Sequence, residues 1–172
     1  MSKRNKAKEI TKREMSKLLG GELPGSILDY LKGNPKNNEG RAILMVTLDK
    51  EGWPHAALLS SWEVFAPDNK NVRLATYVGT ATTSNLERRT LATIILFDSG
   101  KTYYVEGSAV LVRRQMKSDP SNSLFNFKVK SVLEDSIPGV KIKGISFLSR
   151  PDVEGHKILR KELVETQYRG RG

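Results

Sequence analysis

Residues 74–97 read LATYVGTATTSNLERRTLATIILF and indicate the fold more clearly than any other stretch of the chain. The apolar run at 74–78 predicts a strand that ends at Gly79, because glycine is typical of turns. The hydroxyl side chains that follow predict the start of a short helix, and the run at 90–97 predicts a second strand. A strand, a polar helix start and another strand therefore form one local unit.

Five hydroxyl or amide side chains lie within six residues after Gly79. The first N–H groups of a helix lack partners inside it, so hydroxyl groups around them complete a favourable site for a phosphate. A simpler explanation stays open, because Ser84 and Glu87 have the spacing of a capping box. The same side chains serve both explanations, and they are Thr80, Thr82, Thr83, Ser84 and Asn85.

The residues before this unit predict a hairpin. An apolar run at 43–48 leads through DKEG at 49–52 into a second run at 55–65. Asp at the first turn position and Gly at the fourth are typical of a type I turn. The two runs should therefore pair as antiparallel neighbours.

Helices are expected around the strands. Apolar residues among charges predict helices at 6–19 and 23–31, and the charged C-terminal segment predicts another at 153–165. The segment 119–135 predicts a helix that begins near Pro120. Strands are predicted at 43–48, 55–65, 72–78, 90–97, 102–114 and 140–148, with a bulge or bend at Gly107.

Six strands with short antiparallel turns predict a mainly β protein, a small β-barrel with peripheral helices. The length of 172 residues is sufficient for one domain with a substantial core. We expect an N-terminal helical extension at 1–39, the barrel at 40–150, and a C-terminal helix with a basic tail at 151–172.

Composition excludes several kinds of chemistry. The chain has no cysteine, which excludes disulfides, cysteine-bound zinc and thiol catalysis. Its two histidines, His55 and His156, lie far apart without a carboxylate at ligand spacing, so no metal site is predicted. No P-loop, dinucleotide-binding or serine-hydrolase motif is present, and no catalytic residue is identified. A cofactor is therefore expected to supply any difficult chemical step.

The net charge of +10 is concentrated at the ends of the chain, with +5 in residues 1–17 and +3 in residues 157–172. Basic tails bind nucleic acid nonspecifically, but the body has no basic stripe with interleaved aromatics, so specific nucleic-acid binding is not expected. The N-terminus has no apolar run typical of a signal peptide, and no stretch is long enough to span a membrane. We expect a soluble, cytoplasmic protein.

The order of these features resembles the FMN-binding split barrel of the pyridoxamine 5'-phosphate oxidase-like superfamily, which includes the short-chain flavin reductases. Two motifs carry the resemblance, GWPHAALLSS at 52–61 and ATYVGTATTSNLER at 75–88. It extends over roughly residues 40–115. The resemblance implies a six-stranded antiparallel Greek-key split barrel, FMN as the cofactor, and a homodimer with flavin sites at the subunit interface.

The resemblance also implies which residues contact FMN. In the family the second strand runs along the isoalloxazine ring, the third ends beside the ring and ribityl chain, and the next loop holds the phosphate. Asn85 and Leu86 match helix positions with a structural role. The implied cofactor-binding residues are Leu58, Ser60 and Ser61 in the second strand, Thr76, Tyr77 and Val78 in the third, and Thr80, Thr82, Thr83 and Ser84 in the phosphate loop.

One difference separates this chain from the pyridoxamine phosphate oxidases proper. Those enzymes carry an Arg-Lys pair in the phosphate loop, where this chain has Ala81 and Thr82. The phosphate would then be held by hydroxyls, backbone N–H groups and a cation from elsewhere. Oxidation of vitamin B6 is not expected, whereas FMN binding is. The candidate cations are Arg88, Arg73, Lys141 and Lys143.

These expectations favour an FMN-binding oxidoreductase that transfers electrons from a nicotinamide or another reductant to a small acceptor. The main alternative is a non-catalytic module that binds or senses flavin, a deazaflavin or haem. A third candidate is a barrel without cofactor that binds nucleic acid through its basic tails. In the dimer, the groups expected to cover the flavin are Trp53, Trp62 and the predicted helix at 121–134, unless they pack on the barrel of their own subunit.

Overall fold

The computed structural model describes residues 16–38, 40–136, 142–147 and 153–167. Its strands are β1 (Lys17–Gly20), β2 (Arg41–Leu48), β3 (Pro54–Ser60), β4 (Val64–Phe65), β5 (Asn71–Tyr77), β6 (Leu91–Asp98), β7 (Lys101–Arg113), β8 (Asn122–Asp135) and β9 (Ile145–Ser146). Its helices are α2 (Gly25–Lys32), the 3-10 helix η1 (Pro35–Asn38), α3 (Ala81–Arg89) and α4 (Val153–Glu165). None of the helices in these ranges has the length and apolar character needed to cross a membrane.

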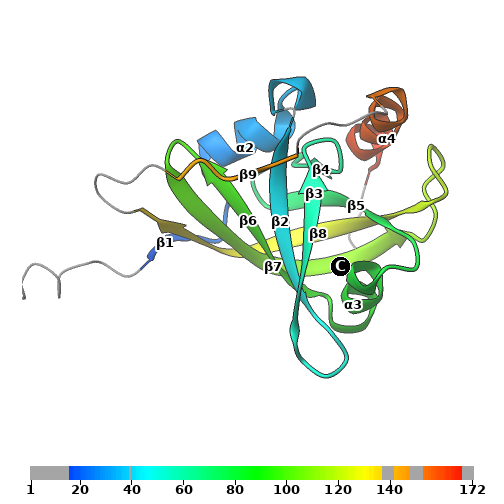
Figure 1. Ribbon diagram of the computed structural model, residues 1–172, viewed down its shortest axis with the longest axis horizontal. Coiled ribbons are helices and arrows are strands. Elements are labelled where there is room, and N and C mark those ends of the chain that lie inside the picture. Colours follow the sequence, from blue (N-terminus) through cyan, green and yellow to red (C-terminus); the bar gives the residue numbers. More distant parts are fainter. Residues whose placement is uncertain (1–15, 39, 137–141, 148–152, 168–172) are drawn as a thin grey trace, which may run out of the picture.

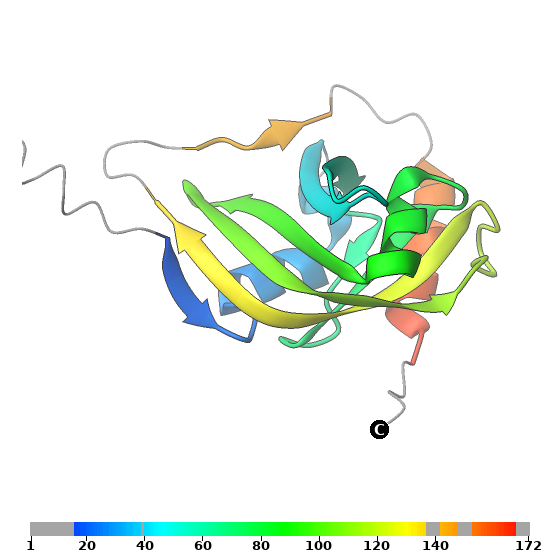
Figure 2. The same ribbon diagram turned by 90° about the horizontal axis from the view of Figure 1, so that it is seen from below.

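The described strands form one antiparallel sheet that curls into a half-barrel (Figures 1 and 2). Neighbours follow the order β3-β2-β6-β7-β8-β5-β4, while β1 pairs with β8 and β9 pairs with β2. The two ends of this order, β3 and β4, are separated in the sequence only by the turn at 61–63. Within that turn the carbonyl oxygen of Glu63 accepts a hydrogen bond from the N–H of Ala75 in β5, at 2.9 Å. β3 and β5 therefore flank the split of the barrel.

The predicted hairpin turn and the predicted bulge are both present in the sheet. In the β2–β3 turn Gly52 has a φ of +95°, and the N–H of Trp53 donates to the carboxylate of Asp49 at 2.8 Å. In β7 the register with β8 shifts at Gly107, where a Cβ atom would lie 2.2 Å from the carbonyl oxygen of Lys128. Both predictions are confirmed, and the bulge lets the two longest strands of the sheet bend.

The main hydrophobic core fills the half-barrel, and two helices contribute to it. Ile27 and Leu31 of α2 and Leu86 of α3 are buried in this core. Burial of each such side chain stabilises the fold by roughly 1.5–3 kcal/mol. α3 contacts β2, β3, β5 and β7, so it crosses the split directly after β5.

The helix α4 packs on the outer side of the sheet. Leu159 and Leu163 of α4 lie in a second hydrophobic cluster with Leu124 of β8, whereas the next residue, Phe125, lies in the main core. β8 is therefore covered on both faces. This arrangement explains why six consecutive residues, 122–127, are buried.

Two helix predictions are wrong. The helix predicted at 119–135 is the strand β8, and the last residues of the helix predicted at 6–19 belong to β1, which pairs with β8. Residues 6–15 lie outside the described part of the chain. A strand covered on both faces loses its alternation, so periodicity does not separate it from a buried helix. Its aromatic and β-branched residues favour the strand.

The other predicted elements are present, although some are shorter than predicted or divided. The run predicted at 55–65 divides into β3 and β4, because the chain turns at 61–63. Of the strand predicted at 140–148, the structure contains β9, which pairs with the start of β2; residues 140, 141 and 148 lie outside the described part. The strands that lie outside the six predicted runs are β1 and β8.

Candidate functional site

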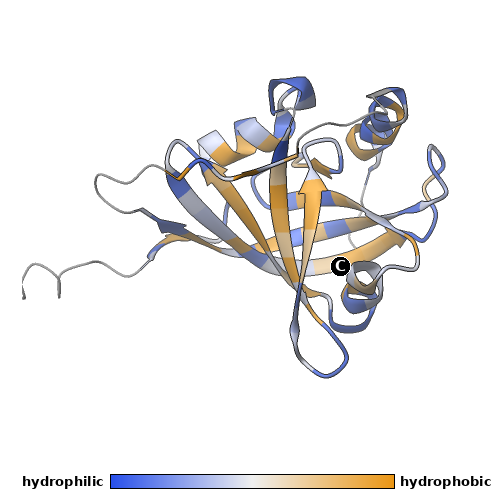
Figure 3. Cartoon of the chain, viewed as in Figure 1, coloured by the Kyte–Doolittle hydropathy of each residue, from blue (hydrophilic) through white to orange (hydrophobic). Residues whose placement is uncertain are grey.

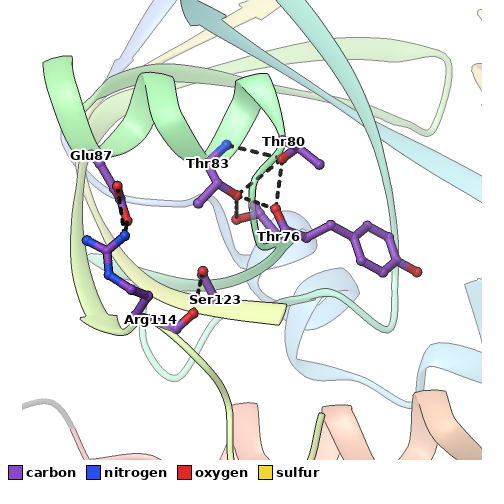
Figure 4. A network of polar contacts seen from close by, with 7 residues as sticks. Thr76, Thr80, Thr83, Glu87, Arg114 and Ser123 are labelled. Atoms are coloured by element: carbon purple, nitrogen blue, oxygen red, sulfur yellow. Dashed lines mark hydrogen bonds and ion pairs between the residues drawn. The ribbon is translucent and has the colours of Figure 1, made fainter. Parts of the chain in front are cut away.

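A network of threonine hydroxyls holds the start of α3 (Figure 4). Thr80 is the N-cap: its hydroxyl accepts a hydrogen bond from the N–H of Thr83 at 3.4 Å and donates to the carbonyl oxygen of Tyr77 at 2.8 Å. The Thr83 hydroxyl donates to the same carbonyl at 2.6 Å and lies 2.8 Å from the Thr76 hydroxyl. These hydroxyls satisfy the helix start and one another.

Burial divides the remaining polar side chains of this segment. Thr82 is buried, and so is Asn85, whose amide donates to the Thr47 hydroxyl at 3.0 Å inside the barrel. Ser84 is exposed, and its hydroxyl has no hydrogen-bond partner in the part of the chain that the structure describes. Capping thus accounts for most of the cluster, while Ser84 stays available to a ligand.

Several exposed residues and two N–H groups without a described partner lie at the start of α3, and together we call them the α3 rim. The N–H groups of Ala81 and Thr82 donate to no described residue, as is usual in the first turn of a helix. With the Ser84 hydroxyl they provide three donors at the positive end of the helix dipole. Exposed apolar side chains lie beside them. The α3 rim consists of Tyr77, Val78, Gly79, Thr80, Ala81, Ser84 and the Thr82 N–H group.

The candidate cations lie in different parts of the molecule. Arg88 is exposed on the same face of α3 as Ser84, since the two are four residues apart. Arg73 is buried and donates to the carbonyl oxygen of Val164 in α4 at 2.9 Å. Lys143 lies near Arg41, at the start of β2, and Lys141 is outside the described residues. Arg88 is therefore the candidate that the fold places near the α3 rim.

Across the split, β3 contributes to a row of apolar side chains on the outer surface of the sheet. Leu58 is 48% exposed and pairs with Leu44 of β2. Leu44 pairs in turn with Ile95 of β6, which pairs with Tyr104 of β7. We call these four partly exposed residues the outer apolar row; Figure 3 shows long hydrophobic stretches on β2, β3 and β6. Since the solvent face of an antiparallel sheet is usually polar, this row indicates a covered surface.

Of the outer apolar row, sequence reasoning identified only Leu58. A signal for the others exists, because the runs 43–46 and 94–97 are apolar at consecutive rather than alternate positions. Such runs are typical of strands that are covered on both faces. The sequence therefore contains evidence for a covered outer surface, although it does not show which strands align.

Ser60 and Ser61 lie at the end of β3 but face inward. The Ser60 hydroxyl donates to the carboxylate of Glu63 at 2.6 Å, and the Ser61 hydroxyl donates to the carbonyl oxygen of Pro35 at 3.2 Å. Both side chains are buried and engaged in the β3–β4 turn. They do not share the exposed surface that Leu58 provides.

The three groups expected to cover a flavin have different positions. Trp53 is 72% exposed at the tip of the β2–β3 hairpin. Trp62 is buried, with its ring centroid 6.4 Å from that of His156 in α4. The segment 121–134 belongs mostly to β8 and is largely internal. Trp53 is therefore the one of these groups that a partner can reach.

Two carboxylates with displaced pKa values lie in and beside the β7–β8 loop rather than at the α3 rim. Hydrogen bonds from the hydroxyl and N–H of Ser121 hold the pKa of Asp119 below its ordinary value. Burial raises the pKa of Glu162 in α4, but hydrogen bonds from Ser118 and its neighbours outweigh this effect and lower it overall. Asp119 thus stabilises the loop internally, whereas Glu162 connects the loop to α4.

Comparison with known proteins identifies the family. Residues 37–135, more than half of the chain, match the model of the pyridoxamine 5'-phosphate oxidase family. The uncharacterized protein YclD of Bacillus subtilis (strain 168) is 31% identical over 121 residues, which are 70% of this chain and 74% of YclD. The chain therefore belongs to the pyridoxamine 5'-phosphate oxidase family, as the motifs implied.

Solved structures agree on the fold. A Lactobacillus delbrueckii protein assigned to the pyridoxamine 5'-phosphate oxidases matches with a TM-score of 0.55 and 15% identity, covering 69% of this chain and 98% of that protein. HupZ of Group A Streptococcus matches with a TM-score of 0.53 and 15% identity, covering 70% and 99% of the two chains. Both similarities show the split barrel.

Proposed function

We propose that the chain binds FMN at the split, with the phosphate at the α3 rim and the isoalloxazine ring along β3. The observation that carries this proposal is the set of donors that capping leaves unused: the N–H groups of Ala81 and Thr82 and the hydroxyl of Ser84. Leu58 on one side and Tyr77 on the other add apolar surface suited to a flat ring.

The donor set fits a phosphate ester even without the Arg-Lys pair. Hydrogen bonds to an ionised acceptor contribute roughly 1.5–3 kcal/mol each, so three of them replace much of an ion pair. Arg88, on the same helix face as Ser84, supplies a nearby positive charge. Family membership supports the same conclusion, since proteins of this family commonly bind flavin or related cofactors.

In the proposed oxidoreductase a bound flavin would supply the redox chemistry, electron transfer from a nicotinamide or another reductant to a small acceptor. The chain's own residues bind and orient it. The α3 rim would hold the phosphate group of the cofactor. Leu58 and the rest of the outer apolar row would keep water from one side of the isoalloxazine ring. In this arrangement no side chain of the α3 rim has to gain or lose a proton.

We further propose a homodimer through the outer apolar row. A flat ring on one face of a monomer would stay largely exposed, whereas binding sites usually bury most of their ligand. A two-fold partner would cover both the ring and the row. Trp53, exposed on a turn in which its N–H donates to Asp49, is the aromatic side chain best placed to contact the partner.

The experiment is purification of the native chain, followed by absorption spectroscopy and mass measurement of the bound molecule. We expect FMN, reduced by NAD(P)H and reoxidised by an added acceptor. A bound flavin, deazaflavin or haem that is not reduced would favour the non-catalytic binding module instead. A chain that binds none of these cofactors, as isolated or after addition, would contradict the proposal.

Sedimentation of the wild type and of Leu58→Asp tests the dimer. We expect the wild type to sediment as a dimer and the variant as a folded monomer near 19.2 kDa, because a charge in the outer apolar row opposes its burial. A wild-type monomer that still binds FMN tightly would contradict the shared site.

A further inference from the structure

A single arginine connects the helix α4 to the turn that joins the two sides of the split. Arg160 is 7% exposed, and its Nη1 donates to the carbonyl oxygens of Ser61, at 3.1 Å, and Val64. Its Nη2 donates to the carbonyl oxygens of Leu31, at 2.7 Å, and Gly33, at 3.3 Å. One guanidinium group therefore bridges α4, the β3–β4 turn and the end of α2.

Backbone dipoles and an aromatic ring stabilise the charge of Arg160. The last carbonyl groups of α2 form the negative end of its helix dipole and lack partners within the helix, so a cation is favourable there. The Phe65 ring centroid lies 4.7 Å from Cζ of Arg160. Burial lowers the pKa of Arg160 to about 10, which still leaves the group charged at neutral pH.

The β3–β4 turn links the positions of β3 and β5. The N–H and hydroxyl of Ser60, the last residue of β3, donate to the carboxylate of Glu63 at 2.7 and 2.6 Å. The carbonyl oxygen of Glu63 accepts from the N–H of Ala75 in β5 at 2.9 Å. Leu58 lies two residues before Ser60, and Tyr77 lies two residues after Ala75. A displacement of the β3–β4 turn would therefore change the distance between Leu58 and Tyr77.

Arg73 provides a natural comparison. It is also buried, stacks on the same Phe65 ring with Cζ 5.7 Å from the centroid, and donates to the carbonyl oxygens of Leu163 and Val164 at the end of α4. It makes no hydrogen bond to the β3–β4 turn or to α2. Arg73 therefore holds α4 on the sheet without fixing the turn.

We infer that Arg160 is a positioning residue for the cofactor site, which it maintains by holding the β3–β4 turn so that β3 and β5 keep the separation that an isoalloxazine ring requires. The inference rests on the proposed FMN site. It gives the helix α4 a role in maintaining that site, although α4 lies outside the residues 37–135 that match the family model.

The test compares Arg160→Met with Arg73→Met by FMN titration, bound-flavin absorption and thermal unfolding. Both variants should lower the melting temperature by similar amounts, because each removes a buried guanidinium group. Arg160→Met should raise the Kd for FMN by about tenfold or more and shift the flavin spectrum towards that of free FMN, whereas Arg73→Met should change the Kd by less than about threefold. Equal effects of the two variants on the Kd, or no effect of Arg160→Met, would overturn the inference.

If Arg160→Met does not fold, Arg160→Lys and Arg73→Lys form the matched pair. Lysine keeps the charge but lacks the planar fork that reaches four carbonyl groups, so Arg160→Lys should still weaken FMN binding more than Arg73→Lys does. The reverse order would contradict the positioning role.

Amide hydrogen exchange separates this inference from the proposed function. The N–H of Ala75 should exchange faster in Arg160→Met than in Arg73→Met, whether or not FMN binds. If the wild type binds no FMN, the proposed function is wrong, and so is a positioning role for a cofactor. If it binds FMN while exchange at Ala75 is the same in both variants, only the positioning role is wrong.

Discussion

The α3 side and the α4 side of the sheet differ in how their polar groups are satisfied. On the α4 side, Arg160 and Glu162 are buried or nearly so, and both are engaged by backbone groups of distant segments. On the α3 side, the threonines satisfy the helix start among themselves, yet the exposed Ser84 hydroxyl and the N–H groups of Ala81 and Thr82 have no described partner.

This difference separates two uses of polar residues. On the α3 side, most of the hydroxyl side chains cap the helix. On the α4 side, the buried charged side chains connect segments that are distant in the sequence. Neither the number of polar side chains nor their burial locates a ligand site. Under the proposed function, the donors left unused at the start of α3, together with the Ser84 hydroxyl, are the groups that hold the phosphate.

On the α4 side a large loss of stability is expected at Arg73, similar to that expected at Arg160 and larger than the losses described below. Arg73→Met removes the donor to two carbonyl oxygens at the end of α4 and leaves them in a poorly hydrated environment. We expect the free energy of unfolding to fall by about 3 kcal/mol, measured by denaturant titration. A loss smaller than that of the capping variant Thr80→Ala would contradict the comparison.

A pH-dependent loss is expected at Glu162, which accepts hydrogen bonds from the N–H groups of Lys117 and Ser118 at 3.1 and 2.6 Å. Because folding lowers the pKa of this carboxylate, its stabilisation is complete above the ordinary glutamate pKa and disappears as the pH falls through the folded value. Glu162→Gln should therefore be less stable than the wild type by roughly 2 kcal/mol at pH 7, with a smaller difference at pH 3. A difference that stays constant with pH would contradict this assignment.

Removing the N-cap should have a smaller effect. Thr80→Ala deletes the hydroxyl that accepts from the N–H of Thr83, and we expect a loss of about 1 kcal/mol in the free energy of unfolding. Thr80→Ser keeps the hydroxyl and should lose much less. Equal stability of the alanine variant and the wild type would show that the threonine network does not hold α3.

Ser84→Ala should leave stability within about 0.5 kcal/mol of the wild type, because its hydroxyl has no described partner. Its affinity for FMN should nevertheless fall about tenfold, as expected for the loss of one hydrogen bond to a phosphate. Ser146→Ala, an exposed serine in β9, is the matched control and should retain full affinity. Unchanged FMN affinity in Ser84→Ala would remove this hydroxyl from the site.

Local features of the fold are predictable from the sequence, whereas long-range contacts are not. The β2–β3 hairpin and the bulge at Gly107 follow from residues that are neighbours in the chain. The strand β8 is misjudged because α4, far along the chain, covers its second face. Arg160 has no local signal at all, since its hydrogen-bond partners are 96 to 129 residues away.

The candidate site follows the same division. The motif after Gly79 correctly marks the start of α3, because a strand end and a helix cap are local features. Which of its hydroxyls face inward depends on how α3 packs across the barrel, and the inward orientation of Ser60 and Ser61 depends on the β3–β4 turn. Neither is encoded in a pattern that sequence alone reveals.

The most direct test of the phosphate site compares the affinities of FMN and riboflavin, which differ only by the phosphate group. The α3 rim, with three donors and a helix N-terminus, predicts that FMN binds the wild type at least about a hundredfold more tightly than riboflavin. In Ser84→Ala the ratio should fall about tenfold, through weaker FMN binding and unchanged riboflavin binding. Equal affinities of the wild type for FMN and riboflavin would show that the α3 rim does not hold the phosphate.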